Sequence, residues 1–93
     1  MPTYISLMKV TDQGAKKAAS AQMDEIMGCI TRDGGRWTGM YTVIGEYDYV
    51  CIFEAPTDET ALTWLQNVSS RGDVKTTTLK GFTKEELAKQ TRR

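Results

Sequence analysis

The sequence predicts an α+β fold of the ferredoxin-like class, with two helices on one face of a four-stranded antiparallel sheet. Two observations predict it. Strand-like and helix-like segments follow one another in the order β-α-β-β-α-β over 93 residues, a length that suits one domain spanning residues 1–93. The two segments that this topology places at the centre of the sheet, residues 4–10 and 47–54, are also the most apolar.

The first third of the chain predicts a strand followed by a helix. Residues 4–10 are rich in apolar and β-favouring side chains and predict the strand. Thr11 or Asp12 can then cap a helix over about residues 13–32, whose apolar residues recur at helical spacing. The run DGG at residues 33–35 ends this helix.

The middle of the chain predicts a hairpin. A second strand runs from about residue 36 to residue 44, and strict alternation places Trp37 and Tyr41 on the same face. Residues 45–46 fit a two-residue loop whose glycine supplies the positive φ of a type II′ turn. The third strand then covers residues 47–54.

The last part of the chain predicts a helix, a strand and a short terminal helix. The second helix opens at residues 56–59 and extends to about residue 70. Its expected apolar face consists of Ala61, Leu62, Leu65 and Val68. A threonine-rich strand follows over residues 74–82. Thr83 and Glu86 have the spacing of a capping box, so residues 83–93 are expected to form a short helix and a tail.

The third strand predicts that both faces of the sheet are covered. Its apolar side chains form two rows, one of Tyr47, Tyr49, Cys51 and Phe53 and one of Val50 and Ile52. Two helices can cover only one row, and the sequence leaves open which one. A second copy packing sheet to sheet would bury the other, so we expect a homodimer or a larger oligomer.

The composition excludes several classes of function. Twelve basic and twelve acidic residues cancel, which argues against a nucleic-acid partner. No apolar run reaches the roughly 20 residues that span a bilayer, so we expect no membrane partner. Two cysteines, Cys29 and Cys51, form no disulfide framework; we expect both to be buried and unreactive in a cytoplasmic protein. The sequence contains no histidine, which excludes His-dependent nucleophilic, zinc and haem sites, and we expect no metal and no cofactor.

Asp48 is the candidate catalytic residue, with Tyr47 as its companion. Asp48 stands between Tyr47 and Tyr49 at the head of the third strand. Its carboxylate can accept hydrogen bonds that fix the hairpin, or it can act as an acid or base beside the tyrosines. The structural role is the stronger expectation.

Four aromatic residues are candidate ligand contacts. Tyr4, Trp37, Tyr41 and Tyr49 are large and carry a polar atom, which suits either a core or dimer interface or an aromatic-lined ligand pocket. Core or interface positions are the stronger expectation.

Several motifs together resemble the GYD domain family. They are the opening MPTYISLMKVTDQG, the hairpin GEYD with Gly45, Tyr47 and Asp48, the following EAPTDE and the late DVKTTTLKGFTKEE. The region from residue 45 to residue 79 is also similar to the effector-binding domain of leucine-responsive transcription regulators. The resemblance implies a dimeric α/β barrel, in which two ferredoxin-like protomers pack their open sheet faces together.

The expected function is therefore that of a small homodimeric domain without catalysis. It would bind a small apolar or aromatic molecule, or a protein partner. The alternative, which the resemblance also allows, is a cofactor-free isomerase or monooxygenase of the dimeric α/β-barrel type that uses Asp48 and a tyrosine for proton transfer.

Overall fold

The computed structural model describes residues 2–32 and 34–91. Along the chain the elements are β1 (Thr3–Val10), a short 3-10 helix (Gly14–Lys16), α1 (Ala19–Arg32), β2 (Arg36–Thr42), β3 (Tyr49–Glu54), α2 (Asp58–Ser70), β4 (Val74–Gly81) and α3 (Lys84–Thr91). Among the described residues, no helix combines the length and the apolar character needed to cross a bilayer.

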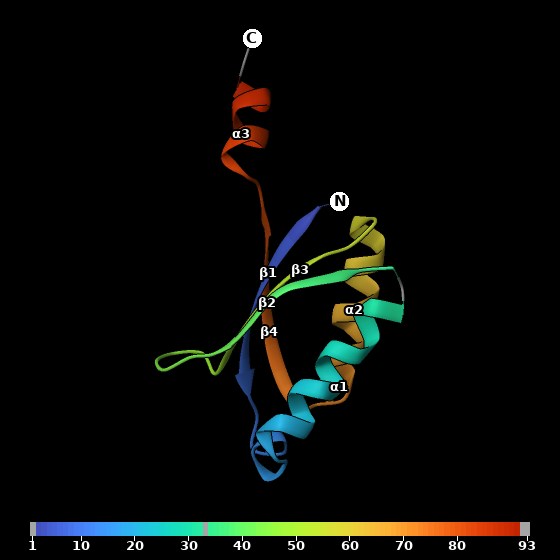
Figure 1. Ribbon diagram of the computed structural model, residues 1–93. Helices are drawn as coiled ribbons and strands as arrows, with labels where there is room; N and C mark the ends of the chain where they lie inside the picture. Colours follow the sequence, from blue (N-terminus) through green and yellow to red (C-terminus); the bar gives the residue numbers. More distant parts are fainter. Residues whose placement is uncertain (1, 33, 92–93) are drawn as a thin grey trace.

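The strands form one antiparallel sheet in the order β2-β3-β1-β4. The central strands are β1 and β3, whose ladder pairs Tyr4 with Phe53 and Met8 with Tyr49. Both α1 and α2 lie on the same face of this sheet, and no helix of the described residues covers the opposite face (Figure 1). This arrangement confirms the predicted ferredoxin-like fold.

The hydrophobic core lies between the sheet and these two helices. Phe53 and Trp64 are fully buried, and their rings meet at a centroid distance of 4.7 Å. The helix-side row of β3 is therefore the row that contains Phe53. The apolar face predicted for α2 is partly wrong. Leu62 is 57% exposed, and Trp64, which was not predicted to belong to this face, is fully buried in the core. The buried core residues are Tyr4, Met8, Ile26, Tyr49, Cys51, Phe53, Ala55, Ala61, Trp64, Val68 and Val74.

The first helix begins later than predicted. A 3-10 helix occupies Gly14–Lys16, and α1 starts only at Ala19. Neither Thr11 nor Asp12 is the N-cap of the 3-10 helix, which is Gln13. Thr11 Oγ1 accepts a hydrogen bond from the N–H of Gly14 at 3.1 Å in the turn before it. A Cβ on Gly14 would lie 2.1 Å from the carbonyl oxygen of Asp73, so this turn is fixed by a long-range backbone contact. Residue 33 of the predicted helix stop lies outside the described residues.

The hairpin loop is longer than the predicted two residues. The second strand ends at Thr42 and the third begins at Tyr49, not at residues 44 and 47. The N–H of Val43 donates to the carbonyl of Asp48 at 2.9 Å, which closes the loop, and Gly45 has the expected positive φ, at 137°. Asp48 is held by β1 as well as by this bond, so the loop is closed directly before β3 starts.

A β-bulge in β2 changes which aromatic residues share a face. Trp37 pairs with Phe53, but the next pair joins Gly39 to Ile52, so Thr38 is an extra residue. Strict alternation is therefore wrong here: Trp37 lies on the helix side of the sheet and Tyr41, which pairs with Val50, lies on the open side.

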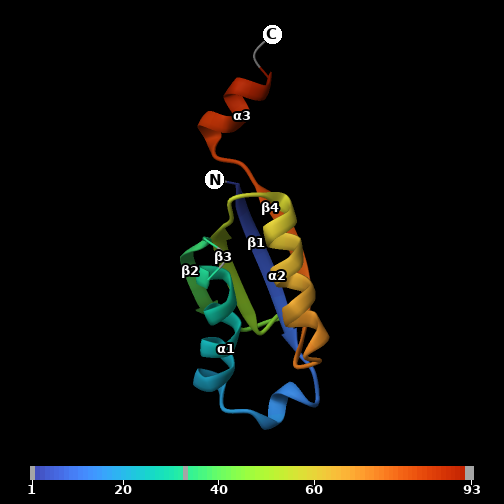
Figure 2. The same cartoon turned by 90° about the vertical axis from the view of Figure 1, so that its right-hand side faces the viewer.

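Helix α3 projects away from the rest of the domain (Figures 1 and 2). The N–H of Thr83 donates to Glu86 Oε1 at 2.8 Å, and the N–H of Glu86 donates to Thr83 Oγ1 at 3.1 Å. These two bonds confirm the predicted capping box. The helix that they start, α3, continues beyond the end of β4 and stands clear of α1 and α2 in both views (Figures 1 and 2).

Candidate functional site

The sheet face opposite the helices carries a continuous apolar surface. In the ladder Ile5 lies between Ile52 and Leu79, and Leu7 lies beside Val50. We call Ile5, Leu7, Tyr41, Val50, Ile52 and Leu79 the open-face cluster. Its central members are only half-buried, and Tyr41 and Leu79 at its sides are 58% and 51% exposed. A single copy of the chain thus leaves this apolar face in contact with water.

Charged groups and one loop surround the open-face cluster. At one end of the sheet, Lys9 and Lys75 lie opposite each other in the ladder between β1 and β4. At the other end of the sheet, Arg36 Nε donates a hydrogen bond to Glu54 Oε1 at 2.8 Å. The loop between β2 and β3 extends on the open side of the sheet (Figure 1), and its Ile44 is fully exposed. An apolar centre with a charged rim is typical of a protein–protein interface.

Three of the four candidate aromatic ligand contacts have their polar atoms engaged: Tyr4 and Tyr49 lie in the core, and the partly buried Trp37 packs against it. The Tyr4 hydroxyl donates to Asp58 Oδ1. Trp37 Nε1 donates to a backbone carbonyl of α1 at 2.8 Å, and the Tyr49 hydroxyl donates to Gln22 Oε1 at 2.9 Å. Tyr41 lies on the opposite face of the sheet, so the structure does not bring the four together. Their role in ligand binding stays a prediction.

Burial keeps the two core tyrosines protonated. It is the largest cause that raises the pKa of Tyr4 to about 12, and the hydrogen bond to Asp58 adds to it. Burial also raises the pKa of Tyr49, followed by the nearby charge of Asp48. At neutral pH both hydroxyls are therefore hydrogen-bond donors and not bases.

Asp48 fastens the start of β3 to β1. Its Oδ2 accepts a hydrogen bond from the N–H of Val10 at 2.8 Å, and its own N–H donates to the carbonyl of Met8 at 2.8 Å. The carboxylate also borders an open cleft of about 330 Å³ whose lining includes Gln22 and Tyr49. Tyr47 is half-buried in the adjoining loop. The proton-transfer roles of Asp48 and Tyr47 stay a prediction.

The buried Asp73 binds two exposed side chains in a polar cluster that the sequence did not reveal. Its side chain accepts hydrogen bonds from Lys17 Nζ at 2.6 Å and from Gln13 Nε2 at 2.8 Å. The Lys17 bond is the largest cause that lowers the pKa of Asp73, and it raises the pKa of Lys17 in return. The sequence shows only an Asp after Gly72 before a strand, a pattern typical of a turn.

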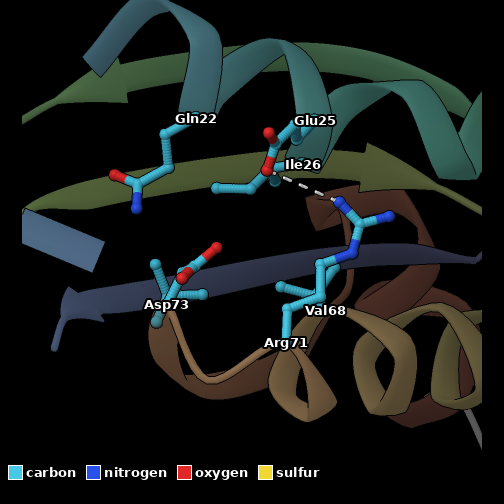
Figure 3. A pocket seen from close by; sticks show the side chains of 7 residues that line it. Gln22, Glu25, Ile26, Val68, Arg71 and Asp73 are labelled. Carbon is cyan, nitrogen blue, oxygen red and sulfur yellow. Dashed lines mark ion pairs between the residues drawn. The ribbon is translucent and has the colours of Figure 1, made fainter. Parts of the chain in front are cut away.

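The cavity beside this cluster is too small for a ligand. It lies between α1 and the end of α2, and its lining includes Gln22, Ile26 and Asp73 (Figure 3). Glu25 and Arg71 form an ion pair of 3.7 Å at its edge. The volume is about 10 Å³, which holds about one water molecule.

A larger apolar groove runs between α2 and the edge strand β4. It has a volume of about 420 Å³ and is lined by Tyr4, Asp58, Ala61, Leu62, Leu65, Thr78 and Lys80. Lys80 and Asp58 form an ion pair of 3.1 Å at its rim. We call this surface the α2–β4 groove. Its size is within the range of ligand sites and of pockets that receive side chains of a partner protein.

The buried sulfur atoms offer no reactive site. Cys51 Sγ lies 3.8 Å from Met8 Sδ and 3.1 Å from Met40 Sδ, and burial raises the pKa of Cys51 to about 12. The thiol of Cys51 is therefore protonated and inert at neutral pH. The side chain of Cys29 lies outside the described residues. Within residues 2–32 and 34–91, no group of three or more Asp, Glu, Cys or His residues could hold a metal ion.

Comparison with known proteins identifies both a family and a fold. The family model described as GYD domain matches residues 4–90. The "glutamine synthetase and cystathionine beta-lyase binding protein" of Thermus thermophilus is 36% identical over 85 residues, which is 88% of this chain and 90% of that protein.

The solved structures with a similar fold include two proteins named as regulatory proteins. A feast or famine regulatory protein from M. tuberculosis, solved with L-methionine, has a TM-score of 0.65 at 16% identity. The leucine response regulatory protein of the same organism has a TM-score of 0.61 at 15% identity. They match 89% and 88% of this chain, which spans only 51% of the length of each regulator. A solved protein from Thermus thermophilus has a TM-score of 0.59 at 21% identity, over 89% of this chain and 95% of its own.

Proposed function

The chain belongs to the GYD domain family, and from this premise we propose that it is a homodimeric binding module whose partner is a metabolic enzyme. The proposal has two parts, the association of two copies and the capture of a partner. Each part rests on its own observation and has its own test.

The open-face cluster supports the homodimer. A contiguous apolar surface of this kind is rarely left exposed on a monomer. Because a twofold axis makes one surface complementary to itself, two copies can cover each other's cluster. The loop between β2 and β3, which contains the exposed Ile44, lies on the same side of the sheet and would extend the contact beyond the strands (Figure 1). Sheet-to-sheet packing would then bury an interface of the standard size, about 1,600 Å².

The Thermus thermophilus relative carries the proposal of a protein partner. It is named for binding glutamine synthetase and cystathionine beta-lyase, and its similarity extends over most of both chains. The geometry supports a partner in preference to a small molecule, because Tyr4, Trp37 and Tyr49 are already engaged within the protomer. We also propose a cytoplasmic location, because two cysteines do not make the disulfide framework that small secreted domains use.

Surface plasmon resonance with purified enzymes tests the partner. The protein is immobilised, and glutamine synthetase and cystathionine beta-lyase from Thermus thermophilus are passed over it separately, with serum albumin as the control. We expect saturable binding of at least one enzyme at micromolar concentration and none of albumin. Failure of both enzymes to bind a chain that is folded by circular dichroism would reject this partner class.

A further inference from the structure

Two lysines stand side by side at one end of the open sheet face. Lys9 of β1 pairs with Lys75 of β4, and Lys9 follows Leu7 on the same face of the sheet. Both side chains are exposed, and neither has an acidic partner among the described residues. Like charges directly opposite each other in a ladder are destabilising, so an anion between the two ammonium groups would stabilise this end of the sheet.

The two lysines line an open cleft with a positive charge. The cleft has a volume of about 490 Å³, and its charged residues are Lys9, Lys75 and Asp12, which give the lining a net charge of +1. The hydroxyl of Thr11 in the same lining already donates to the carbonyl of Gly72 at 2.6 Å. The two ammonium groups are therefore the donors that an occupant would meet. We call this surface the lysine cleft.

The loop between β2 and β3, residues 43–48, has the opposite charge. It contains Glu46 and Asp48 and no basic residue. Asp48 is held by the N–H of Val10, whereas the side chain of Glu46 is exposed and has no partner among the described residues. The loop extends on the open side of the sheet (Figure 1). It therefore presents a carboxylate to whatever covers the open face.

The loop and the lysine cleft lie at the same end of the sheet but on opposite halves of it. The loop joins β2 to β3, and the lysines lie on β1 and β4, in a sheet of order β2-β3-β1-β4. The bond from the N–H of Asp48 to the carbonyl of Met8 holds the end of the loop beside the end of β1. When two such faces pack under a twofold axis parallel to the strands, equal ends meet and the halves exchange. The loop of each copy then lies over the lysine cleft of the other.

The alternative axis, which crosses the strands between the two sheets, would bring the loop to a pair of charges that is already complete. The loop would then lie over the far end of β2 and β3, where Arg36 Nε donates to Glu54 Oε1 at 2.8 Å. Glu46 would add a negative charge to this neutral pair, and the two lysines would stay without an anion. Charge complementarity therefore favours the axis parallel to the strands.

We propose that the loop of residues 43–48 of one copy docks in the lysine cleft of a second copy, with the Glu46 carboxylate between Lys9 and Lys75. This inference rests on the proposed homodimer and deepens it, because it assigns the direction of the twofold axis and a specific contact. The contact occurs twice in each dimer. The open-face cluster then forms the apolar centre of the interface, and the two loops form part of its charged rim.

Mixing two charge-reversed chains tests the docking. One chain carries Glu46→Lys, and the other, with a longer affinity tag, carries Lys9→Glu and Lys75→Glu. In either homodimer both loop contacts become repulsive, whereas in the mixed dimer both are attractive. Native mass spectrometry of an equimolar mixture measures the ratio of mixed dimers to homodimers. We expect this ratio to be at least about tenfold higher than for two wild-type chains with different tags, because close charge pairs at an interface couple strongly.

The matched control replaces the Glu46→Lys chain by an Asp24→Lys chain. Asp24 is exposed on α1, on the helix side of the sheet, and its substitution gives the same net charge. Mixed with the lysine-reversed chain, it forms one attractive and one repulsive loop contact, so we expect no excess of the mixed dimer. Circular dichroism verifies that each chain is folded, and Lys75→Glu alone takes the place of the double reversal if that chain is unfolded.

Two results would overturn the docking. No excess of the mixed dimer in either mixture would reject the loop as the occupant and leave the two lysines to an anion from outside the dimer. An equal excess in both mixtures would assign the attraction to net charge and not to the loop. The wild-type chain separates the two proposals: wild-type dimers without the excess defeat only the loop docking, and a wild-type monomer at micromolar concentration defeats the homodimer as well.

Discussion

Two adjacent residues of β3 should respond in opposite ways to a new charge. Val50 belongs to the open-face cluster, whereas Tyr49 is 4% exposed in the core beneath the helices. We expect Val50→Glu to leave the protomer folded and to separate the dimer. We expect Tyr49→Glu to unfold the protomer, because the same charge is then placed on the opposite face of the sheet.

The expected size of the Val50→Glu effect follows from the symmetry of the dimer. Burying one unpaired ion costs several kcal/mol, and a twofold interface buries two. At roughly 3 kcal/mol for each ion, the dimer loses about 6 kcal/mol, which is about four orders of magnitude in Kd. In the free protomer Val50 lies on an open surface, where a substitution typically changes stability by no more than about 0.5 kcal/mol.

The Tyr49→Glu effect falls on the fold itself. Removing a buried aromatic ring costs about 3–5 kcal/mol, and the hydrogen bond to Gln22 is lost with it. Burying the unpaired carboxylate adds a desolvation cost to this loss. The total loss of stability then exceeds about 5 kcal/mol, the lower end of the usual range of about 5–15 kcal/mol for a domain.

Sedimentation velocity and far-ultraviolet circular dichroism together read out both effects at micromolar protein concentration. We expect a folded monomer for Val50→Glu and the loss of ordered secondary structure for Tyr49→Glu. Thr63→Glu on the outer surface of α2 is the matched control and should remain a folded dimer. The assignment of the open-face cluster to the interface would be refuted by a Val50→Glu chain that is still dimeric, or by one that is unfolded.

Three further predictions concern single side chains. Asp48→Asn retains an acceptor for the N–H of Val10 but loses the negative charge. Urea unfolding should therefore show that the free energy of unfolding falls by about 1 kcal/mol, with partner binding retained. Normal stability with lost binding would instead point to a functional carboxylate. Because Lys17 holds the pKa of Asp73 below its ordinary value, the contribution of Asp73 to stability is present above about pH 4 and is lost as the pH falls through its folded pKa. Asp73→Asn should flatten this part of the acid-unfolding curve, and an unchanged curve would contradict the ion pair. Glu86→Ala should speed amide hydrogen exchange in α3 about fivefold, since a lost cap costs about 1 kcal/mol; a shifted urea midpoint of the whole domain would show that α3 is part of the core.

Local chemistry predicted most of the fold. The central positions of β1 and β3 followed from their apolar sequences, and the capping box at Thr83 followed from spacing alone. These features depend on residues close together in the chain, so the sequence contains them directly.

Three features that the sequence did not predict depend on contacts between residues far apart in the chain. Gly14 ends the loop after β1 because it packs on the backbone of Asp73, and nothing near Gly14 in the sequence indicates that contact. The extra residue Thr38 is defined by the register of β2 on β3, and periodicity within β2 cannot show it. The open-face cluster was predicted as one of two apolar rows, but only the packing of Trp64 on Phe53 decides which row faces the helices.

The position of β1 also determines when this protein can fold during its synthesis. β1 is made first, yet its ladder partners lie in β3 and β4, and Thr3 pairs with Gly81. At a synthesis rate of about 5–20 residues per second, an emerging β1 waits roughly 4–14 s before β4 exists. Until β3 has been made, the apolar β1 has neither of its neighbours, and until β4 has been made one of its edges stays open to pairing with other nascent chains. Completion of the sheet is therefore a late event, and chaperone binding to the first strand would protect the chain when it is most prone to aggregate.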